Sequence, residues 1–356
     1  MHIGFYNFYT AYNRNRMFLS PESTVGDNLA APFVDMARML AARGHRVSTI
    51  DMAPLDSYDA IVFLDYPTRW NAYFRRALRS ADIPLYLVLQ ESQAIRPDNY
   101  RARNHRGFRK VFTWHDGLVD GNRYIKWFNA VDFGSVPKDD GGDRRLLCAL
   151  VAGNKFSNHP AELYSARRDT LKWFAAHAPA DIALYGEGWD RWYVPQAGFL
   201  GNAVLAKLYR IMPGLPRRRA YPFWKGTIRW KMDVLRGARF CICYENAVFP
   251  GYITEKIFDC FFAGCVPVYW GAPNVTEYIP SGAFIDRGRF TSHEDLHAYL
   301  RGMPESEYNG YRAAISDYLA SEQARLFGAE HMTNVVLQHI VGDAANRSSG
   351  SNPGGG

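Results

Sequence analysis

The sequence predicts an α/β protein built from two doubly wound domains, each with a parallel sheet. Its 356 residues are typical of two domains. Short apolar runs that suit buried strands alternate with segments whose apolar residues recur at helical spacing. A stretch rich in proline, glycine and charge at 136–145 interrupts this alternation once. We interpret that stretch as the linker between the domains.

The first half of the chain contains five predicted strands and one long helix. The strands are HIGFYNF (2–8), RVSTID (46–51), AIVFLD (60–65), PLYLVLQ (84–90) and KVFTWH (110–115). The helix covers 26–45 and ends at Gly44, a residue suited to a helix stop. This order implies right-handed crossovers within a parallel sheet. No G-x-G-x-x-G follows the first strand, so nothing in this half requires a dinucleotide.

The second half repeats the pattern and ends in helices. Its predicted strands are 145–153, 181–186, 240–244 and 266–270, and its predicted helices are 162–177, 253–264, 292–302, 305–320 and 324–341. We expect the last helix, over 326–346, to cross back onto the first domain. The low-complexity end, 347–356, is expected to be disordered.

Composition restricts the partners and the compartment. The formal net charge of +7 favours anionic partners such as nucleotide phosphates or lipid headgroups, although plain surface solvation gives the same balance. All five cysteines lie in apolar segments, which predicts reduced thiols. The sequence has no apolar run of 18 residues. We therefore expect a cytoplasmic protein, with peripheral attachment to the inner face of the cell membrane as a further hypothesis.

The stretch from Tyr244 to Gly271, YENAVFPGYITEKIFDCFFAGCVPVYWG, carries the strongest functional signal. It reads as strand, loop, helix and strand, with polar residues gathered at the loop and at the helix start. In open parallel sheets, ligands bind beyond the carboxyl ends of strands and beside helix N-termini. Lys256 lies in the first helical turn, where the helix dipole disfavours a cation. A bound phosphate removes that conflict, whereas a solvated surface lysine is the alternative.

The same stretch resembles the signature of the α1,3-fucosyltransferases, an inverting family that uses GDP-fucose. The pattern is ENxxxxxYITEKxxxxxxxGxVPVYWG, and the likeness continues through 272–290. The resemblance implies the GT-B architecture, in which two Rossmann-like domains face each other across a cleft. It assigns 1–140 to an acceptor domain and 141–325 to a domain that binds the GDP-sugar donor.

The resemblance also implies the donor-binding residues. They are Arg167, Lys231, Glu245, Asn246, Tyr252, Thr254, Glu255 and Lys256. Arg167 comes from the Ser-Ala-Arg at 165–167, and the neighbouring Arg168 is an open alternative. Lys231 comes from 224–237, which resembles a lysine-rich helix of the family.

Six of the donor-binding residues carry an expected role. Lys256 and Arg167 neutralise the pyrophosphate, so that no metal or other cofactor is required. Tyr252 donates to a phosphate oxygen. Glu255 accepts hydroxyl groups of ribose or fucose, or else is only a favourable acid of the first helical turn. Glu245 and Asn246 shape the loop or contact the sugar, and Asn274 is expected to cap the short helix that follows it.

The resemblance assigns the general base to Glu91, which comes just after the predicted strand 84–90. Inverting transfer needs a base that takes the proton of the acceptor hydroxyl. A carboxylate at a strand end is otherwise a helix cap or a solvated loop residue. His115, Asp116 and Asp65 also follow predicted strands and stay as alternatives.

The favoured reading is an inverting glycosyltransferase that moves L-fucose from GDP-β-L-fucose to a hydroxyl of a glycan, such as a cell-surface polysaccharide or lipopolysaccharide. Alternatives are another GDP-sugar donor, a nucleotide-sugar epimerase or hydrolase, or a non-catalytic basic module that binds polyanions. We expect no nucleic-acid partner, because no such motif is present. Basic and aromatic residues interleave over 203–239, which suggests docking on an anionic membrane or else a solvated loop.

Overall fold

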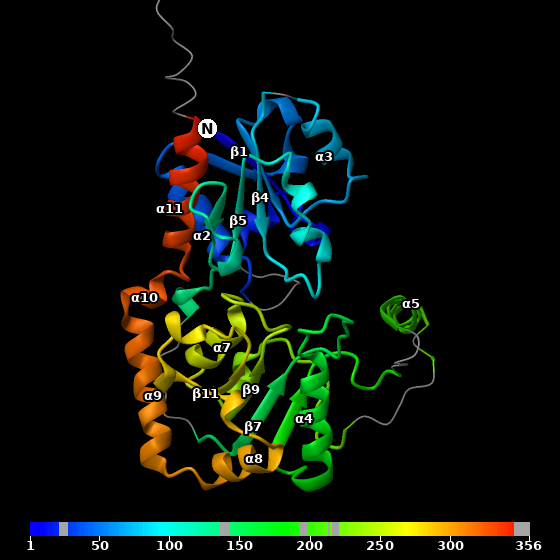
Figure 1. Ribbon diagram of the computed structural model, residues 1–356, viewed down its shortest axis with the longest axis vertical. Helices are drawn as coiled ribbons and strands as arrows, with labels where there is room; N and C mark the ends of the chain where they lie inside the picture. The colour runs from blue at the N-terminus through cyan, green and yellow to red at the C-terminus, as the bar shows by residue number, and fades with distance from the viewer. Residues whose placement is uncertain are drawn as a thin grey trace, which may run out of the picture. The chain divides into compact units, whose positions relative to one another are not determined.

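The computed structural model describes residues 1–20, 28–80, 82–135, 143–192, 198–212, 214–215 and 221–344. The chain divides into two compact units (Figure 1). The first consists of Met1–Gly134 and Glu322–Gly356, and the second of Ser135–Ser321. Most of the expected linker and all of the expected disordered tail, 347–356, lie outside the described residues.

The first unit is built on a six-stranded parallel sheet with the order β2-β1-β3-β4-β5-β6. The strands are β1 (His2–Tyr6), β2 (Arg46–Thr49), β3 (Ala60–Leu64), β4 (Leu85–Leu89), β5 (Lys110–Thr113) and β6 (Tyr124–Lys126). Every residue of β3 and β4 is buried, as expected for central strands with both faces covered. The sequence pattern missed β6, because three residues at a sheet edge are too short to show a period.

Helices cover both faces of this sheet. The helices of this unit are α1 (Arg16–Leu19), α2 (Ala31–Ala41), α3 (Ala72–Ala77), α10 (Glu322–Arg325) and α11 (Ala329–Val336), which continues as a π turn, Leu337–Val341. α11 and α2 pack side by side on one face (Figure 1). Phe74 of α3 packs in the core of the other face. The single helix expected over 324–341 is wrong, because Gly328 separates α10 from α11 in an extended conformation.

The second unit contains a five-stranded parallel sheet with the order β11-β10-β9-β7-β8. The strands are β7 (Leu146–Val151), β8 (Ile182–Tyr185), β9 (Ala238–Tyr244), β10 (Val266–Trp270) and β11 (Ile285–Asp286). The helices are α4 (Tyr164–His177), α5 (Gly198–Ile211), α6 (Met232–Leu235), α7 (Glu255–Phe262), α8 (His293–Gly302) and α9 (Glu305–Ala320). All five cysteines belong to this unit, and they are free and buried.

Two features of the second unit bear on the site. α7 packs against β9 and β10 and ends before Gly264, whose φ of 62° is the left-handed conformation expected of a helix stop. The helix expected over 224–237 is wrong, because only α6 is helical. The chain before α6 instead extends the edge of the sheet, where Leu184 donates to the carbonyl of Phe223 and accepts from the amide of Lys225.

Candidate functional site

The polar residues of the Tyr244–Gly271 stretch meet at the carboxyl end of β9, around the buried carboxylate of Glu245. Glu245 is fully buried. Its Oε1 accepts the amide of Thr254 at 2.9 Å, and its Oε2 accepts the Thr254 hydroxyl at 2.8 Å and Lys256 Nζ at 3.2 Å. A buried charge is tolerated only when it is paired and hydrogen-bonded, and these three contacts supply that compensation. Glu245 therefore fixes the end of β9 to the start of α7, and of its two expected roles it fills the one of shaping the loop.

Arg167 holds the same strand end from the other side. It lies in the first turn of α4 and is buried. Its Nη2 donates to the carbonyl oxygens of Tyr244 and Glu245 at 2.5 and 2.8 Å and to Asn246 Oδ1 at 3.2 Å. Because every one of these bonds uses Nη2, the rest of the guanidinium has no hydrogen-bond partner among the described residues. Arg168 is turned elsewhere, since its Nη1 donates to the carbonyl of Lys155 at 2.9 Å.

Lys256 and Lys231 form a network with two carboxylates on one face of α7. Lys256 Nζ lies 3.5 Å from Glu255 Oε1, and Lys231 Nζ lies 2.7 Å from Asp259 Oδ2 and 4.0 Å from Glu255 Oε1. Burial by itself raises the pKa of Glu255, but the two lysines outweigh it and lower this pKa to about 2. Glu255 is therefore ionised at neutral pH and can only accept hydrogen bonds.

Asn246 and Tyr252 complete the support of the loop. Asn246 Nδ2 donates to the Tyr252 hydroxyl at 3.4 Å, while its Oδ1 accepts from Arg167. Tyr252 is buried. The structure thus brings all eight expected donor-binding residues together at the carboxyl end of β9 and the start of α7. Each of the eight makes at least one hydrogen bond or ion pair within the protein.

Three cations line a narrow cavity at the carboxyl end of this sheet. Arg167, Lys231 and Lys256 surround it together with Asp259 and with the ends of β7 and β9. Its volume is about 30 Å³. That volume suits about one water molecule, so a nucleotide cannot enter the cavity and could only lie over its opening.

Some residues of the site were missed by sequence reasoning. One of them is Asp259, which pairs with Lys231. The sequence could have revealed it, because Asp259 lies four residues after Glu255 and both acids therefore share one face of the helix. Asn274 was expected to cap the short helix that follows it, but its side chain makes no capping hydrogen bond there. Its Oδ1 instead accepts the amide of Gly251 at 2.8 Å, and its Nδ2 donates to Glu277 Oε2 at 2.9 Å. Asn274 thereby fixes the loop before α7.

Glu91 belongs to the first unit and lies two residues after the end of β4. Its amide donates to Asp65 Oδ1 at 3.0 Å, and its carbonyl accepts from Asn99 Nδ2 and the Tyr100 hydroxyl, both at 3.2 Å. Asp65 is buried, and its Oδ1 also accepts from the amide of Gln90 and from Asn99 Nδ2. Asp65, an alternative base, is thus an anchor for the loop that carries Glu91.

The other two alternative bases lie after β5 in the same unit. His115 Nδ1 accepts the amide of Gly117 at 3.2 Å, and Asp116 forms an ion pair with Lys126. Both side chains are therefore engaged in local contacts. Among the residues that the structure describes, no helix is long and apolar enough to cross a membrane, and no group of three or more His, Cys, Asp or Glu side chains could hold a metal.

Comparisons with known proteins confirm the resemblance and the fold class. Residues 222–326 match the model of the C-terminal domain of glycosyltransferase family 10 (fucosyltransferase). The chain is 31% identical over 120 residues to an α-(1,4)-fucosyltransferase of Arabidopsis thaliana, covering 33% of this chain and 29% of the relative. It is 31% identical over 75 residues to the α-(1,3)-fucosyltransferase FucT of Helicobacter pylori, covering 21% and 16%. The matches thus span less than a third of these relatives.

Two solved structures extend the likeness over both units. One is an α1,3-fucosyltransferase crystallised with GDP, at a TM-score of 0.52 and 13% identity, covering 92% of each chain. The other is a DNA-modifying β-glucosyltransferase, at a TM-score of 0.56 and 11% identity, covering 95% of this chain and 99% of that one. At these identities the likeness shows the fold, two parallel α/β units of the GT-B class.

Replacing Gly271 with alanine tests how tightly Glu245 is held. An added Cβ would lie 2.5 Å from Glu245 Cγ and still closer to the Tyr269 hydroxyl. We expect Gly271→Ala to lower the free energy of unfolding by about 1–3 kcal/mol. The matched control is Gly310→Ala in α9, where nothing lies within 4 Å. The control should raise stability slightly through helix propensity. Urea unfolding of both variants measures the difference, and equal stability would contradict this packing.

Proposed function

We propose that this chain, which carries the C-terminal domain of glycosyltransferase family 10, transfers L-fucose from GDP-β-L-fucose to a hydroxyl of a glycan with inversion. One observation carries the proposal. The region that matches the family model contains a buried carboxylate, Glu245, which presets Lys256 at the carboxyl end of a parallel sheet. Ligands of such sheets bind at that position.

The donor's pyrophosphate is proposed to lie over the opening of the cavity between Arg167 and Lys256. When the sugar leaves, negative charge grows on the β-phosphate, and preset cations stabilise that charge without reorganising. Arg167 and Lys256 both line this cavity. We infer that these side chains, with Lys231, which also lines the cavity, neutralise the leaving group without a metal ion.

The remaining donor residues divide into two roles in this proposal. Glu255 stays ionised and accepts hydroxyl groups of the ribose or of the sugar. Asn246, Tyr252 and Thr254 position the loop. This differs from the expectation that Tyr252 donates to a phosphate oxygen, because its side chain is 1% exposed.

Glu91 is proposed as the base that removes the proton of the acceptor hydroxyl. It follows a fully buried strand, and Asp65, Asn99 and Tyr100 hold its backbone in place. A base on a fixed backbone keeps its carboxylate in the geometry that proton transfer needs. The sugar is then displaced in a single step, so the β-linked donor gives an α-linked product and GDP.

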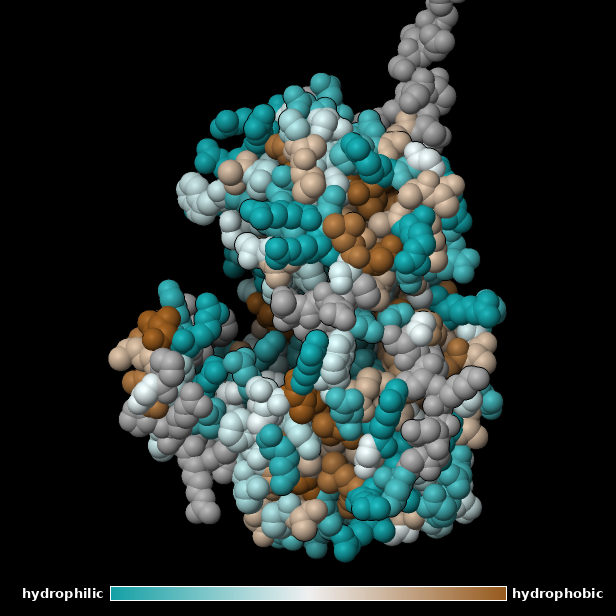
Figure 2. All heavy atoms as spheres, turned by 180° about the vertical axis from the view of Figure 1, so that it is seen from behind, coloured by the Kyte–Doolittle hydropathy of each residue, from teal (hydrophilic) through white to brown (hydrophobic). Residues whose placement is uncertain are grey.

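We also propose that α5 docks on an anionic membrane that presents the acceptor. Val204, Ile211 and Met212 are 59%, 62% and 52% exposed, and the cationic side chains of Lys207 and Arg210 are exposed beside them. Hydrophobic atoms gather over α5 (Figure 2). Such a mixture of apolar and basic side chains suits the headgroup boundary of a bilayer. The lipopolysaccharide or polysaccharide identity of the acceptor rests on this proposal.

Nucleotide binding tests the donor site. We expect GDP to raise the melting temperature more than UDP or ADP does, with a stabilisation of about 2.7 kcal/mol at a hundred times its Kd. Lys256→Ala should weaken GDP binding by about 10- to 100-fold, because a charged hydrogen bond is lost. The control Lys172→Ala removes a 67% exposed lysine of α4 and should leave GDP affinity unchanged. Equal losses in both variants would contradict the site, and loss of activity in EDTA would contradict metal independence.

The base is tested by Glu91→Gln. We expect kcat for GDP-fucose, with lipopolysaccharide as acceptor, to fall by about 100- to 10,000-fold. GDP affinity, measured by calorimetry, should stay nearly unchanged, since Glu91 belongs to the other unit from the donor residues. Glu330→Gln, on the exposed side of α11, is the matched control. A variant that loses GDP binding as fully as turnover would refute this assignment of roles.

Membrane docking is tested with liposomes of phosphatidylserine and phosphatidylcholine at low salt. We expect the protein to sediment with them, and Lys207→Ala combined with Arg210→Ala to weaken partitioning by about 10-fold or more. The double variant Arg38→Ala with Arg43→Ala makes the same charge change at exposed positions in α2 and just after it, and it should bind as the unmodified protein does. No sedimentation of the unmodified protein would end this idea.

A further inference from the structure

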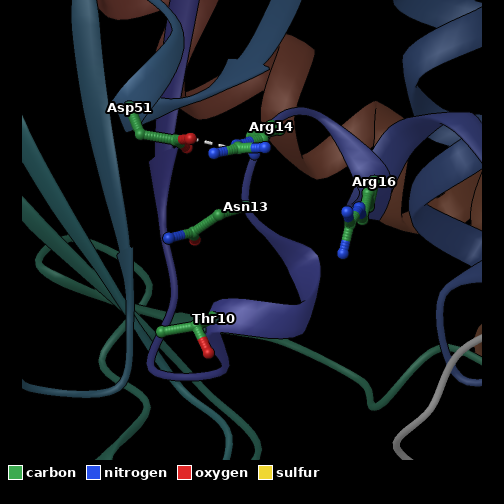
Figure 3. A pocket seen from close by; sticks show the side chains of 5 residues that line it. All are labelled: Thr10, Asn13, Arg14, Arg16 and Asp51. Carbon is green, nitrogen blue, oxygen red and sulfur yellow. Dashed lines mark hydrogen bonds between the residues drawn. The ribbon is translucent and has the colours of Figure 1, made fainter.

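A second polar cavity lies in the first unit, apart from the donor residues. Its volume is about 300 Å³, and it is lined by Thr10, Asn13, Arg14, Arg16 and Asp51. These residues come from the segments that follow β1 and β2 in the chain, beyond the carboxyl ends of both strands. Figure 3 shows Asp51 and Arg16 on opposite sides, with Asn13 between them. This is the sheet end at which open α/β units bind their ligands.

The backbone at this cavity is held in an uncommon conformation. Arg14 and Asn15 have φ of 57° and 60°, in the left-handed region that non-glycine residues seldom adopt. Three hydrogen bonds impose it. The amide of Arg14 donates to Asp51 Oδ2 at 2.9 Å, the amide of Asn15 donates to Thr49 Oγ1 at 2.9 Å, and the amide of Thr49 donates to Asn15 Oδ1 at 2.8 Å. Such conformations cluster at ligand-binding sites because the surrounding structure must enforce them.

The cavity combines two kinds of recognition group. Arg14 and Arg16 are exposed, and their guanidinium groups have no hydrogen-bond or ion-pair partner within the described ranges. Guanidinium groups bind carboxylate and phosphate through paired N–H donors. Asp51 Oδ2 is occupied by the Arg14 amide, whereas its Oδ1 is buried and has no partner among the described residues. An acceptor of this kind requires a donor, which a sugar hydroxyl supplies.

We propose that this cavity binds an acidic sugar unit of the acceptor, with its anionic group on Arg14 and Arg16 and a hydroxyl group on Asp51 Oδ1. Thr10 and Asn13 supply further donors and acceptors for ring hydroxyls. A neutral sugar leaves both cations unused, and a simple anion leaves Asp51 without a donor. The proposal rests on the glycosyltransferase function proposed above and narrows its acceptor to anionic glycans, in which a uronate or a sugar phosphate supplies the charge.

Tyr9 links this cavity to the proposed base. It directly precedes Thr10, it is 50% exposed, and its ring packs at 6.1 Å from the ring of Tyr12. Burial raises the pKa of Tyr9, and the carboxylates of Glu91 and Asp65 raise it further, so its phenol lies in the field of the proposed base. In this proposal, a glycan whose reacting hydroxyl meets Glu91 extends along Tyr9 and places a neighbouring acidic sugar in the cavity.

Ligand-observed saturation-transfer NMR on the full chain tests the proposal, with D-glucuronate and D-glucose 6-phosphate as anionic probes and D-glucose as the neutral probe. Inorganic phosphate, the simple anion, has no observable proton and is measured by its displacement of the preferred anionic probe. We expect binding of one or both anionic sugars, and affinity for glucose and for inorganic phosphate lower by about tenfold or more. The two anionic probes distinguish a carboxylate from a phosphate ester. Arg14→Ala combined with Arg16→Ala should weaken the preferred probe by about tenfold or more.

The control Arg75→Ala with Arg76→Ala removes two exposed arginines from α3 and should bind as the unmodified protein does. Equal binding of glucose and the anionic sugars, phosphate binding as tight as theirs, or unchanged binding in the Arg14 and Arg16 variant would each overturn the proposal. GDP titration distinguishes failure of this proposal from failure of the proposed enzyme function. If the protein does not bind GDP, the donor site is wrong. If it binds GDP but the cavity prefers no acidic sugar, only the acceptor proposal is wrong.

Discussion

The buried carboxylate of Glu245 is the interaction on which the donor region depends. A charge without solvent must be matched by nearby donors, and here Thr254 and Lys256 are the donors. The same contacts fix where the chain turns from β9 into α7. Electrostatics and loop geometry are therefore coupled at this position, because Lys256, which compensates the buried acid, is also the side chain proposed to meet a phosphate.

The charges at this site are balanced rather than positive. Arg167, Lys231 and Lys256 are matched by three carboxylates, Glu245, Glu255 and Asp259. In the proposed donor complex, the pyrophosphate meets cations whose orientation is already fixed but whose charge is partly compensated. Such an arrangement limits affinity for free anions and favours a state in which extra charge develops on the ligand, which is the condition for stabilising a leaving group.

Sequence reasoning recovered what depends on long, periodic segments. The spacing of apolar residues predicted the central strands and the helices α4 and α7, and the residue type predicted that a helix stops at Gly264. Short edge strands such as β6 and β11 escaped it, since two or three residues show no period. The partners of Asn274 and Asp259 could not be foreseen either, because both depend on tertiary contacts that local pattern does not encode. The clustering of the donor residues was foreseeable from their place beyond one strand end.

The two units use one device to present their reactive groups. In each, an acid placed just after a strand is buried and accepts hydrogen bonds from the loop that carries the candidate group. Asp65 holds the amide of Glu91, and Glu245 holds Thr254 and Lys256. The two acids differ in their charge partner.

Glu245 is paired with a lysine, while burial raises the pKa of Asp65 and its Oδ1 relies on backbone and amide donors alone. The anchor in the second unit therefore keeps a cation fixed beside a carboxylate. The anchor in the first unit instead fixes a backbone, because Asp65 Oδ1 accepts the amides of Gln90 and Glu91 and the side chain of Asn99. An acid just after a strand thus fixes a charged side chain in one unit and a loop backbone in the other.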